Sequence, residues 1–188
     1  TLFASGDSIT DAKLEPIWPR ALRLDDTIRD PIAPHVAMVE IVARRAREFD
    51  LIHLHCDHIA YPLMSRINVP VVSTLHGRLD MAELVPIYQL YPNIQLVSIS
   101  DSQRVFLPEA NYVGTVLHGL PDNLLSEGPG DGDYLAFLGR ISPEKGPDAA
   151  IRIAGAAGMK LKIAAKVDKA DRDYFATQIA PLLEQPHV

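Results

Sequence analysis

Short apolar runs alternate along the chain with longer segments in which apolar and polar positions follow a helical period. Several of the short runs predict β-strands, because most are continuous in Val, Ile, Leu and Ala instead of alternating with polar residues. Continuous apolar strands are typical of parallel sheets that are covered on both faces. The predicted strands are Leu2–Ala4, Leu51–His55, Val71–Leu75, Leu96–Ser100, Gly114–Leu117, Tyr134–Leu138 and Leu161–Ala165.

Three of the longer segments between the strands predict helices. In the first, His35–Phe49, the predicted buried face carries Val36, Val39, Val42, Ala43 and Ala46, with Arg44, Arg45 and Glu48 largely opposite. The second helix begins at Pro147, a residue suited to the first helical position, and ends before Gly158. The third covers Lys169–Leu183, and Pro181 should disturb its last turn.

The alternation of strands and helices predicts βαβ units and therefore an α/β fold with parallel sheets. The segment Ser126–Asp133, "SEGPGDGD", is rich in Gly, Pro and acidic residues and has no large apolar side chain. It predicts a linker at 126–133 between an N-terminal unit at 1–125 and a second unit that starts at 134 and runs to 188. In such sheets ligands bind beyond the carboxyl ends of the strands.

Composition narrows the functional classes. The hydrophobic fraction of 47% and the charged fraction of 22% are those of an ordinary globular protein. A net charge of −6 argues against a nucleic-acid partner, which would favour a basic face. The single cysteine, Cys56, excludes an internal disulfide, and no apolar run reaches the ~20 residues that cross a bilayer. We therefore expect a soluble, cytoplasmic protein.

The segment "FLGRISPEKGPDAAIRIA" carries the most chemical information. A strand runs to Gly139 and Arg140, and a short loop then brings Lys145 to the start of the helix at Pro147. Glycine at 139 would allow a tight turn and a close approach of a ligand. Two cations beside a helix N-terminus, where backbone amides point outward, form a site for a diphosphate without a metal ion. The plainer interpretation is a solvated loop in which Arg140 or Lys145 pairs with Glu144.

This segment resembles the donor-binding signature of GT-B glycosyltransferases, in particular the retaining enzymes of family four (glycosyltransferase group 1), whose pattern is a strand, then G-R-x-x-x-x-K-G, then a helix. Other stretches are similar to further parts of the family pattern in the same order: "FDLIHLH", "VPVVSTLHG", "LVSISDSQR", "VLHGLP" and "LKIAAKVDKADRDYF". The resemblance implies two Rossmann-like units. The N-terminal one would lack its first strand and helix, and the C-terminal one would be truncated.

The resemblance also implies roles for individual residues. Arg140 and Lys145 would contact the diphosphate of a nucleotide-sugar donor and stabilise the charge that departs, and Gly139 would shape the phosphate loop. His76 matches the family histidine at the reaction centre. Gly119 matches the glycine of the family's asparagine–glycine pair, whereas His118 replaces the asparagine; both are possible residues of the cleft.

The implied function is that of a retaining, hexosyltransferase-type glycosyltransferase. It would need no cofactor and no metal, and would transfer a sugar from a nucleotide-diphosphate donor to an acceptor hydroxyl on a sugar, lipid or small molecule. The segment Ala4–Thr10 could contact the acceptor or could be a plain polar turn. Peripheral membrane association is not evident in these residues. The family's glycine-rich loop and acidic segment would lie before Thr1 and after Val188. We therefore expect a piece of a longer protein that is inactive alone.

Two other functions remain open. The chain could be a non-catalytic module that binds a nucleotide sugar or phosphate. The stretch "HLHCDH" also has the H-x-H-x-D-H spacing with which metallo-β-lactamase-type hydrolases hold two zinc ions, through His53, His55, Asp57 and His58. Glycines do not follow the last histidine, and the βα pattern does not suit that fold. We favour a buried, hydrogen-bonded His53, and an Asp57 that caps the next helix.

Overall fold

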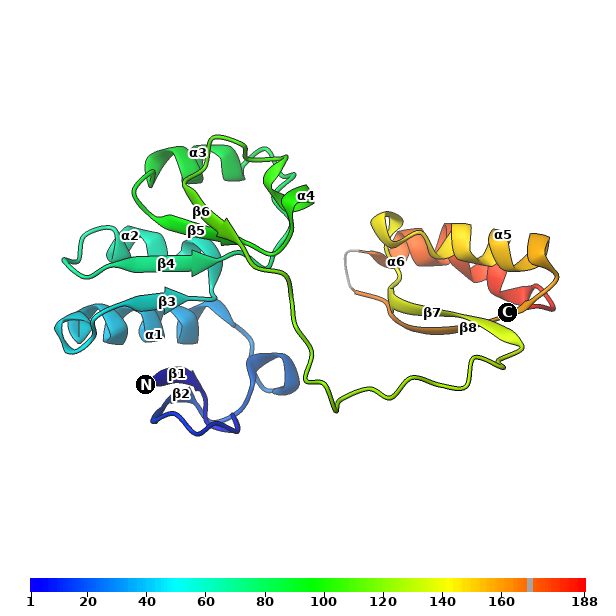
Figure 1. Cartoon of the computed structure of the whole chain (residues 1–188), viewed down its shortest axis with the longest axis horizontal. Coiled ribbons are helices and arrows are strands. Elements are labelled where there is room, and N and C mark those ends of the chain that lie inside the picture. Colours follow the sequence, from blue (N-terminus) through cyan, green and yellow to red (C-terminus); the bar gives the residue numbers. More distant parts are fainter. Residues whose placement is uncertain (169–170) are drawn as a thin grey trace. The chain divides into compact units, whose positions relative to one another are not determined.

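The computed structural model describes residues 1–168 and 171–188. Cα packing divides the chain into two compact units, Thr1–Leu120 and Pro121–Val188 (Figure 1). Both units are mixed α/β, and the strands of every sheet are parallel. This agrees with the fold class that the alternating pattern predicts.

The main sheet of the first unit has the order β3-β4-β5-β6. Its strands are β3 (Ile52–Leu54), β4 (Val71–Thr74), β5 (Gln95–Ser98) and β6 (Tyr112–Thr115). A second, two-stranded sheet pairs β1 (Leu2–Ser5) with β2 (Leu14–Trp18). Strand β2 was not predicted from the sequence, because Pro16 interrupts its apolar pattern.

Helices and short turns connect these strands. They are the 3₁₀ turn Leu22–Leu24, α1 (Ile32–Arg44), the 3₁₀ turns Ala46–Glu48 and Asp57–Ala60, α2 (Tyr61–Met64), α3 (Leu84–Leu90) and α4 (Asp101–Arg104). Helix α1 is the predicted helix, begun three residues earlier and ended at Arg44, with the remainder in the 3₁₀ turn. The prediction for Val36 was wrong: it is 52% exposed, whereas Val39 and Val42 are buried.

One hydrophobic core holds the first unit together. It joins Val39 and Val42 of α1 to Ile52 and Leu54 of β3, and Phe3 of β1 packs against it. At its centre the Tyr61 hydroxyl donates to Ser73 Oγ at 3.1 Å, so the buried serine has a partner. Helix α1 therefore shares one hydrophobic core with β3 and with Phe3 of β1.

The second unit consists of β7 (Tyr134–Arg140), α5 (Pro147–Ala157), β8 (Lys160–Lys166) and a helical C-terminal region. Helix α5 packs on β7 and β8 through Ile151 and Ala154 (Figure 1). The predicted helix Lys169–Leu183 begins outside the described residues. From Arg172 onward the region is α6 (Arg172–Tyr174), a π-helical turn (Phe175–Ile179) and a 3₁₀ turn (Ala180–Glu184) that contains Pro181.

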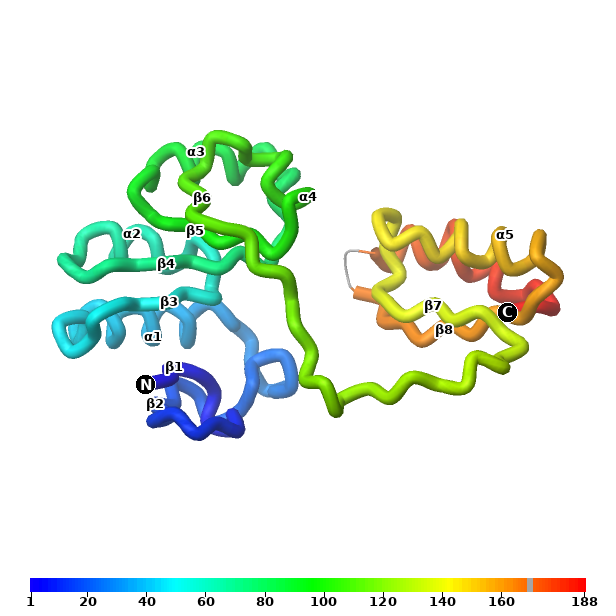
Figure 2. Tube along the Cα trace, in the orientation of Figure 1, coloured from blue at the N-terminus to red at the C-terminus, as the bar shows by residue number. Residues whose placement is uncertain are grey.

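The first residues of the second unit are exposed. Residues 121–133 include the predicted linker and contain no helix or strand (Figure 2). Within the part of the chain that the structure describes, no helix has both the length and the apolar composition that crossing a membrane requires.

Candidate functional site

The predicted phosphate loop connects the end of β7 to the start of α5. Arg140 is the last residue of β7, the 3₁₀ turn Pro143–Lys145 follows, and Gly146 adopts a left-handed conformation with φ 65° before α5 begins at Pro147. Side chains with a Cβ rarely adopt this conformation, so glycine is required at 146 to turn the chain into the helix. The loop therefore carries Arg140 and Lys145 at the amino end of an 11-residue helix.

Arg140 takes part in a small network of charges on the surface. Its Nη2 donates to Glu144 Oε1 at 3.0 Å, and its Nη1 lies 3.5 Å from Asp168 Oδ2. Lys166 Nζ is 2.7 Å from the other oxygen of Asp168. The hydrogen bond from Lys166, together with the charge of Arg140, lowers the pKa of Asp168. The guanidinium is about half exposed, so a ligand in solvent can reach it.

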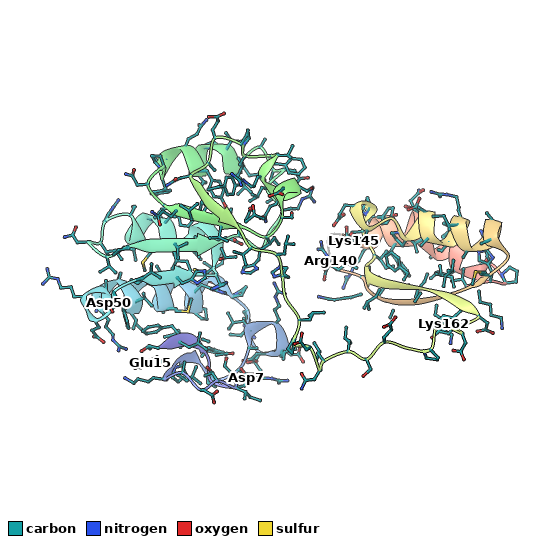
Figure 3. The ribbon with its side chains drawn as sticks, in the orientation of Figure 1. Asp7, Glu15, Asp50, Arg140, Lys145 and Lys162 are labelled. Carbon is teal, nitrogen blue, oxygen red and sulfur yellow. The ribbon has the colours of Figure 1, made fainter. Side chains whose placement is uncertain are left out.

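Lys145 is exposed beside this network. No hydrogen bond or ion pair joins its ammonium to any other residue in 1–168 or 171–188. Figure 3 places Arg140 and Lys145 at one end of the second unit and Lys162 at the opposite end, where its Nζ lies 3.7 Å from the Tyr134 ring centroid. Two exposed cations thus lie beside the amino end of α5, and together they can bind an anion with several oxygens.

The expected tight turn at Gly139 is not present. Gly139 lies within β7 and pairs with Ala165 of β8, and its φ is not positive. A Cβ placed there would meet no atom closer than Phe137 Cζ at 3.6 Å. The loop turns at Gly146 instead. The neighbouring Ser142 is 1% exposed, and its Oγ has no hydrogen-bond partner among the described residues.

The first unit carries a second cluster of polar side chains, which we call the histidine row: His53, His55, His76 and His118. His53 and His55 lie in and just after β3, and His76 follows β4. Because neighbouring parallel strands bring their carboxyl ends to one edge of the sheet, residues separated by some twenty positions meet there. His118 belongs to the segment after β6.

Contacts within the row are close. His55 Nδ1 and His76 Nε2 are 2.8 Å apart, so an N–H of one ring donates a hydrogen bond to a nitrogen of the other. The rings of His76 and His118 stack with centroids 5.5 Å apart at 11°, and those of His53 and His55 lie 4.2 Å apart. Burial lowers the pKa of His55, and positive charge on His53 and His76 would lower it further.

His53 and Asp57 differ from what the sequence predicted. His53 is exposed, not buried, although its Nε2 does form the expected kind of hydrogen bond, at 2.8 Å to Thr74 Oγ1. Asp57 does not cap the following turn, whose N-cap position is taken by Cys56. Asp57 has φ 48°, and its carboxylate faces the loop after β4, where the His76 amide lies 3.5 Å from Oδ1.

Gln103 supports the loop that carries His76, a role that the sequence analysis missed. Its Nε2 donates to the carbonyls of Leu75 at 3.2 Å and Gly77 at 2.8 Å, on either side of His76. Its Oε1 accepts a hydrogen bond from the Ile99 backbone amide. The backbone amide of Gln103 donates to Oγ of Ser100, the N-cap residue of α4. The S-x-x-Q spacing of a capping box at Ser100 could have identified this residue.

Gly119 and His58 are the remaining residues that the sequence predicted for a site, and both are exposed. Gly119 is exposed, and a Cβ built on it would meet no atom within 4 Å, so space does not require glycine there. His58 is exposed on the turn after β3. Across residues 1–168 and 171–188, no group of three or more His, Cys, Asp or Glu side chains is placed to hold a metal ion. The zinc ligand set suggested by H-x-H-x-D-H is therefore not assembled among these residues.

Comparison of the sequence with models of known protein families finds no family that matches, and comparison with curated proteins finds no match either.

Proposed function

We propose that the chain is part of a retaining glycosyltransferase of the GT-B type. Arg140 and Lys145 bind the diphosphate of a nucleotide-sugar donor, and His76 acts beside the sugar carbon that is transferred to an acceptor hydroxyl. The proposal combines the residue pattern of the sequence with the local geometry of each unit.

The observation that carries the proposal is the loop from Arg140 to Pro147. It presents an exposed guanidinium and an exposed ammonium beside the amino end of α5. A guanidinium can donate to two phosphoryl oxygens at once, while lysine contributes a compact positive charge. As the bond between sugar and diphosphate breaks, negative charge grows on the departing group, and these donors stabilise it.

The histidine row supports the role of His76. The bond to His55 and the stacking on His118 fix the orientation of the His76 ring, and the two Gln103 hydrogen bonds fix its loop. A ring held in this way keeps one face and one nitrogen in a constant position, which an interaction with a reacting sugar requires.

Calorimetry with nucleoside diphosphates tests the phosphate site. Arg140→Ala should weaken binding by about 1.5–3 kcal/mol, the scale of a charge-assisted hydrogen bond. Arg152→Ala is the matched control, since Arg152 also lies exposed in the second unit and pairs with Asp148 at 2.6 Å. Equal affinity in the two variants would remove the loop from the proposal.

A transfer assay then distinguishes the enzyme from a module that only binds the donor. The assay needs the longer protein that contains these residues, because we expect the isolated residues to be inactive. His76→Ala should abolish transfer from a nucleotide sugar and leave diphosphate binding unchanged. If the unaltered longer protein binds the donor and transfers no sugar, the binding module is the correct assignment.

A further inference from the structure

Arg140 has a positively charged neighbour on the adjacent strand of the second unit. β7 and β8 lie side by side (Figure 1), and their last residues, Arg140 and Lys166, are paired in the parallel register. The pairing continues by one residue, since the Ile141 amide donates to the Lys166 carbonyl at 2.9 Å. Paired residues of neighbouring strands point to the same face, and both of these side chains are exposed. Like charges in directly opposed positions destabilise a sheet, so this pair favours an anion beside it.

Asp168 supplies such an anion. Its Oδ1 is 2.7 Å from Lys166 Nζ, and its Oδ2 is 3.5 Å from Arg140 Nη1, so each oxygen faces a different cation. The hydrogen bond from Lys166 and, to a smaller extent, the contact with Arg140 lower the pKa of the Asp168 carboxyl, which keeps it ionised. The two cations therefore share one internal carboxylate.

A phosphoryl group can replace this carboxylate. Both groups present negative oxygens to N–H donors, and arginine and lysine bind either of them. The side chains of Arg140 and Lys166 are 49% and 78% exposed, so a ligand can reach both cations without a change in the sheet. Asp168 lies two residues beyond the end of β8, so its side chain can rotate away without breaking the strand pairing. The carboxyl ends of parallel strands are also where ligands bind in such sheets.

The number of cations indicates which kind of phosphoryl group suits this place. Lys145 lies at the same end of the unit as Arg140 (Figure 3), so Lys166 brings a third positive charge. A phosphoryl group that ends a molecule carries about −1.5 to −2 charges at pH 7, whereas one that is esterified on both sides carries a single charge. When the bond between a sugar and its diphosphate breaks, the electron pair stays on the diphosphate oxygen, and that end becomes terminal. Three cations therefore suit the diphosphate product better than the donor.

We propose that Lys166 is a third phosphate-binding residue, and that the place of the Asp168 carboxylate between Arg140 and Lys166 is the subsite of a terminal phosphoryl group. This inference rests on the proposed function and adds a preference to it. The site binds a diphosphate with a free end more tightly than one that is esterified at both ends. Asp168 occupies the subsite when no such ligand is bound.

Calorimetry with two probes that contain neither base nor sugar tests this preference. The probes are inorganic pyrophosphate, in which both phosphoryl groups are terminal, and dimethyl diphosphate with one methyl ester on each phosphorus, in which neither is. The whole chain should bind pyrophosphate more tightly. Lys166→Gln should weaken pyrophosphate binding about three- to tenfold and dimethyl diphosphate binding about twofold or less, because the lost contact is to the more highly charged group.

Two matched variants control for the net charge of the unit. Lys160 is the first residue of β8 and lies on the same face as Lys166 at the other end of the strand, so Lys160→Gln removes an equal charge away from the subsite. It should leave both affinities unchanged. Asp168→Asn should strengthen pyrophosphate binding about two- to fivefold, because the internal carboxylate loses its charge. Glu184→Gln, at an exposed position of the 3₁₀ turn Ala180–Glu184, should have no such effect.

The outcomes separate this inference from the proposed function. Equal effects of Lys166→Gln and Lys160→Gln, together with weaker binding in Arg140→Ala, would overturn the role of Lys166 and leave the diphosphate site in place. An equal loss of both probes in Lys166→Gln would overturn the preference for a terminal phosphoryl group. Unchanged binding in Arg140→Ala as well, or no binding of millimolar pyrophosphate to the unaltered chain, would overturn both proposals.

Discussion

At the scale of single residues, the glycines at 139 and 146 have different structural roles. Gly146 occupies the left-handed region at φ 65°, whereas Gly139 is a strand residue with ordinary contacts. The first is needed by the backbone of the loop. The second would be needed only if a ligand approaches the backbone closely.

Alanine substitutions test this difference. Gly146→Ala should destabilise the second unit by about 1–2 kcal/mol, the cost of a left-handed residue with a Cβ. Gly139→Ala should raise the free energy of unfolding by about 0.5 kcal/mol, because alanine loses less conformational entropy in a strand than glycine does. Urea titration followed by the NMR signals of α5 measures both. Equal losses in the two variants would contradict the distinction.

The residues of the site were predictable from the sequence to different degrees. The positions of Arg140 and Lys145 around the start of α5 could be predicted, because the strand, turn and helix signals are local. The stacking of His76 on His118 could not, since it depends on where two distant segments meet. Nor could the conformation of Asp57, because its φ of 48° follows from contacts with the loop after β4.

At the scale of elements, the helical period of apolar residues predicted α1 but placed its start three residues too late. The helix starts at Ile32, and Val36, assigned to the apolar face, is 52% exposed. Pro34 and His35 of this turn are half-buried while Ile32 and Val36 are exposed, so an apolar residue there does not reveal burial. Arg45, assigned largely to the polar face, turns its guanidinium over Phe3 and Phe49 and pairs with Glu48.

His55, which follows β3, should make the stability of the first unit depend on pH. Burial and neighbouring histidines lower the pKa of His55, so the folded state binds its proton less tightly than the unfolded chain does. This contribution to stability is complete above the ordinary histidine pKa of about 6.5 and is lost as the pH falls through the lower folded value.

Fluorescence of Trp18, the single tryptophan, follows this unit in urea. The urea midpoint should be lower at about pH 5.5 than at about pH 7.5, and His55→Gln should reduce the difference. His58→Gln, at an exposed position outside the row, should leave the difference unchanged. A midpoint that is the same at both pH values would contradict the lowered pKa of His55.

At the scale of the whole molecule, two compact units are joined by an exposed connection. Residues 121–133 contain no helix or strand, and each unit has its own buried core. The sequence itself shows that residues 126–133 carry no large apolar side chain. The apolar pattern alone does not show that β1 and β3 belong to separate sheets, because pairing between parallel strands depends on contacts remote in sequence.

Limited proteolysis provides a test of this organisation. A glutamate-specific protease should cut first after Glu127, since exposed segments without regular structure are the preferred sites of cleavage. The products should be 1–127 and 128–188, each retaining the amide protection of its core. Glu127→Gln should slow the first cut, and a first cut elsewhere would show that the connection is protected.

The charge network around Arg140 has a consequence for competition among anions. The guanidinium already interacts with Glu144 and Asp168, so an incoming anion must exchange places with carboxylates instead of meeting a bare cation. A singly charged ion such as acetate or chloride gains little from that exchange. A diphosphate, with several charges and more oxygens, would gain from the guanidinium and Lys145 together. We therefore expect a diphosphate, and not acetate or chloride, to displace the carboxylates of Glu144 and Asp168 from Arg140.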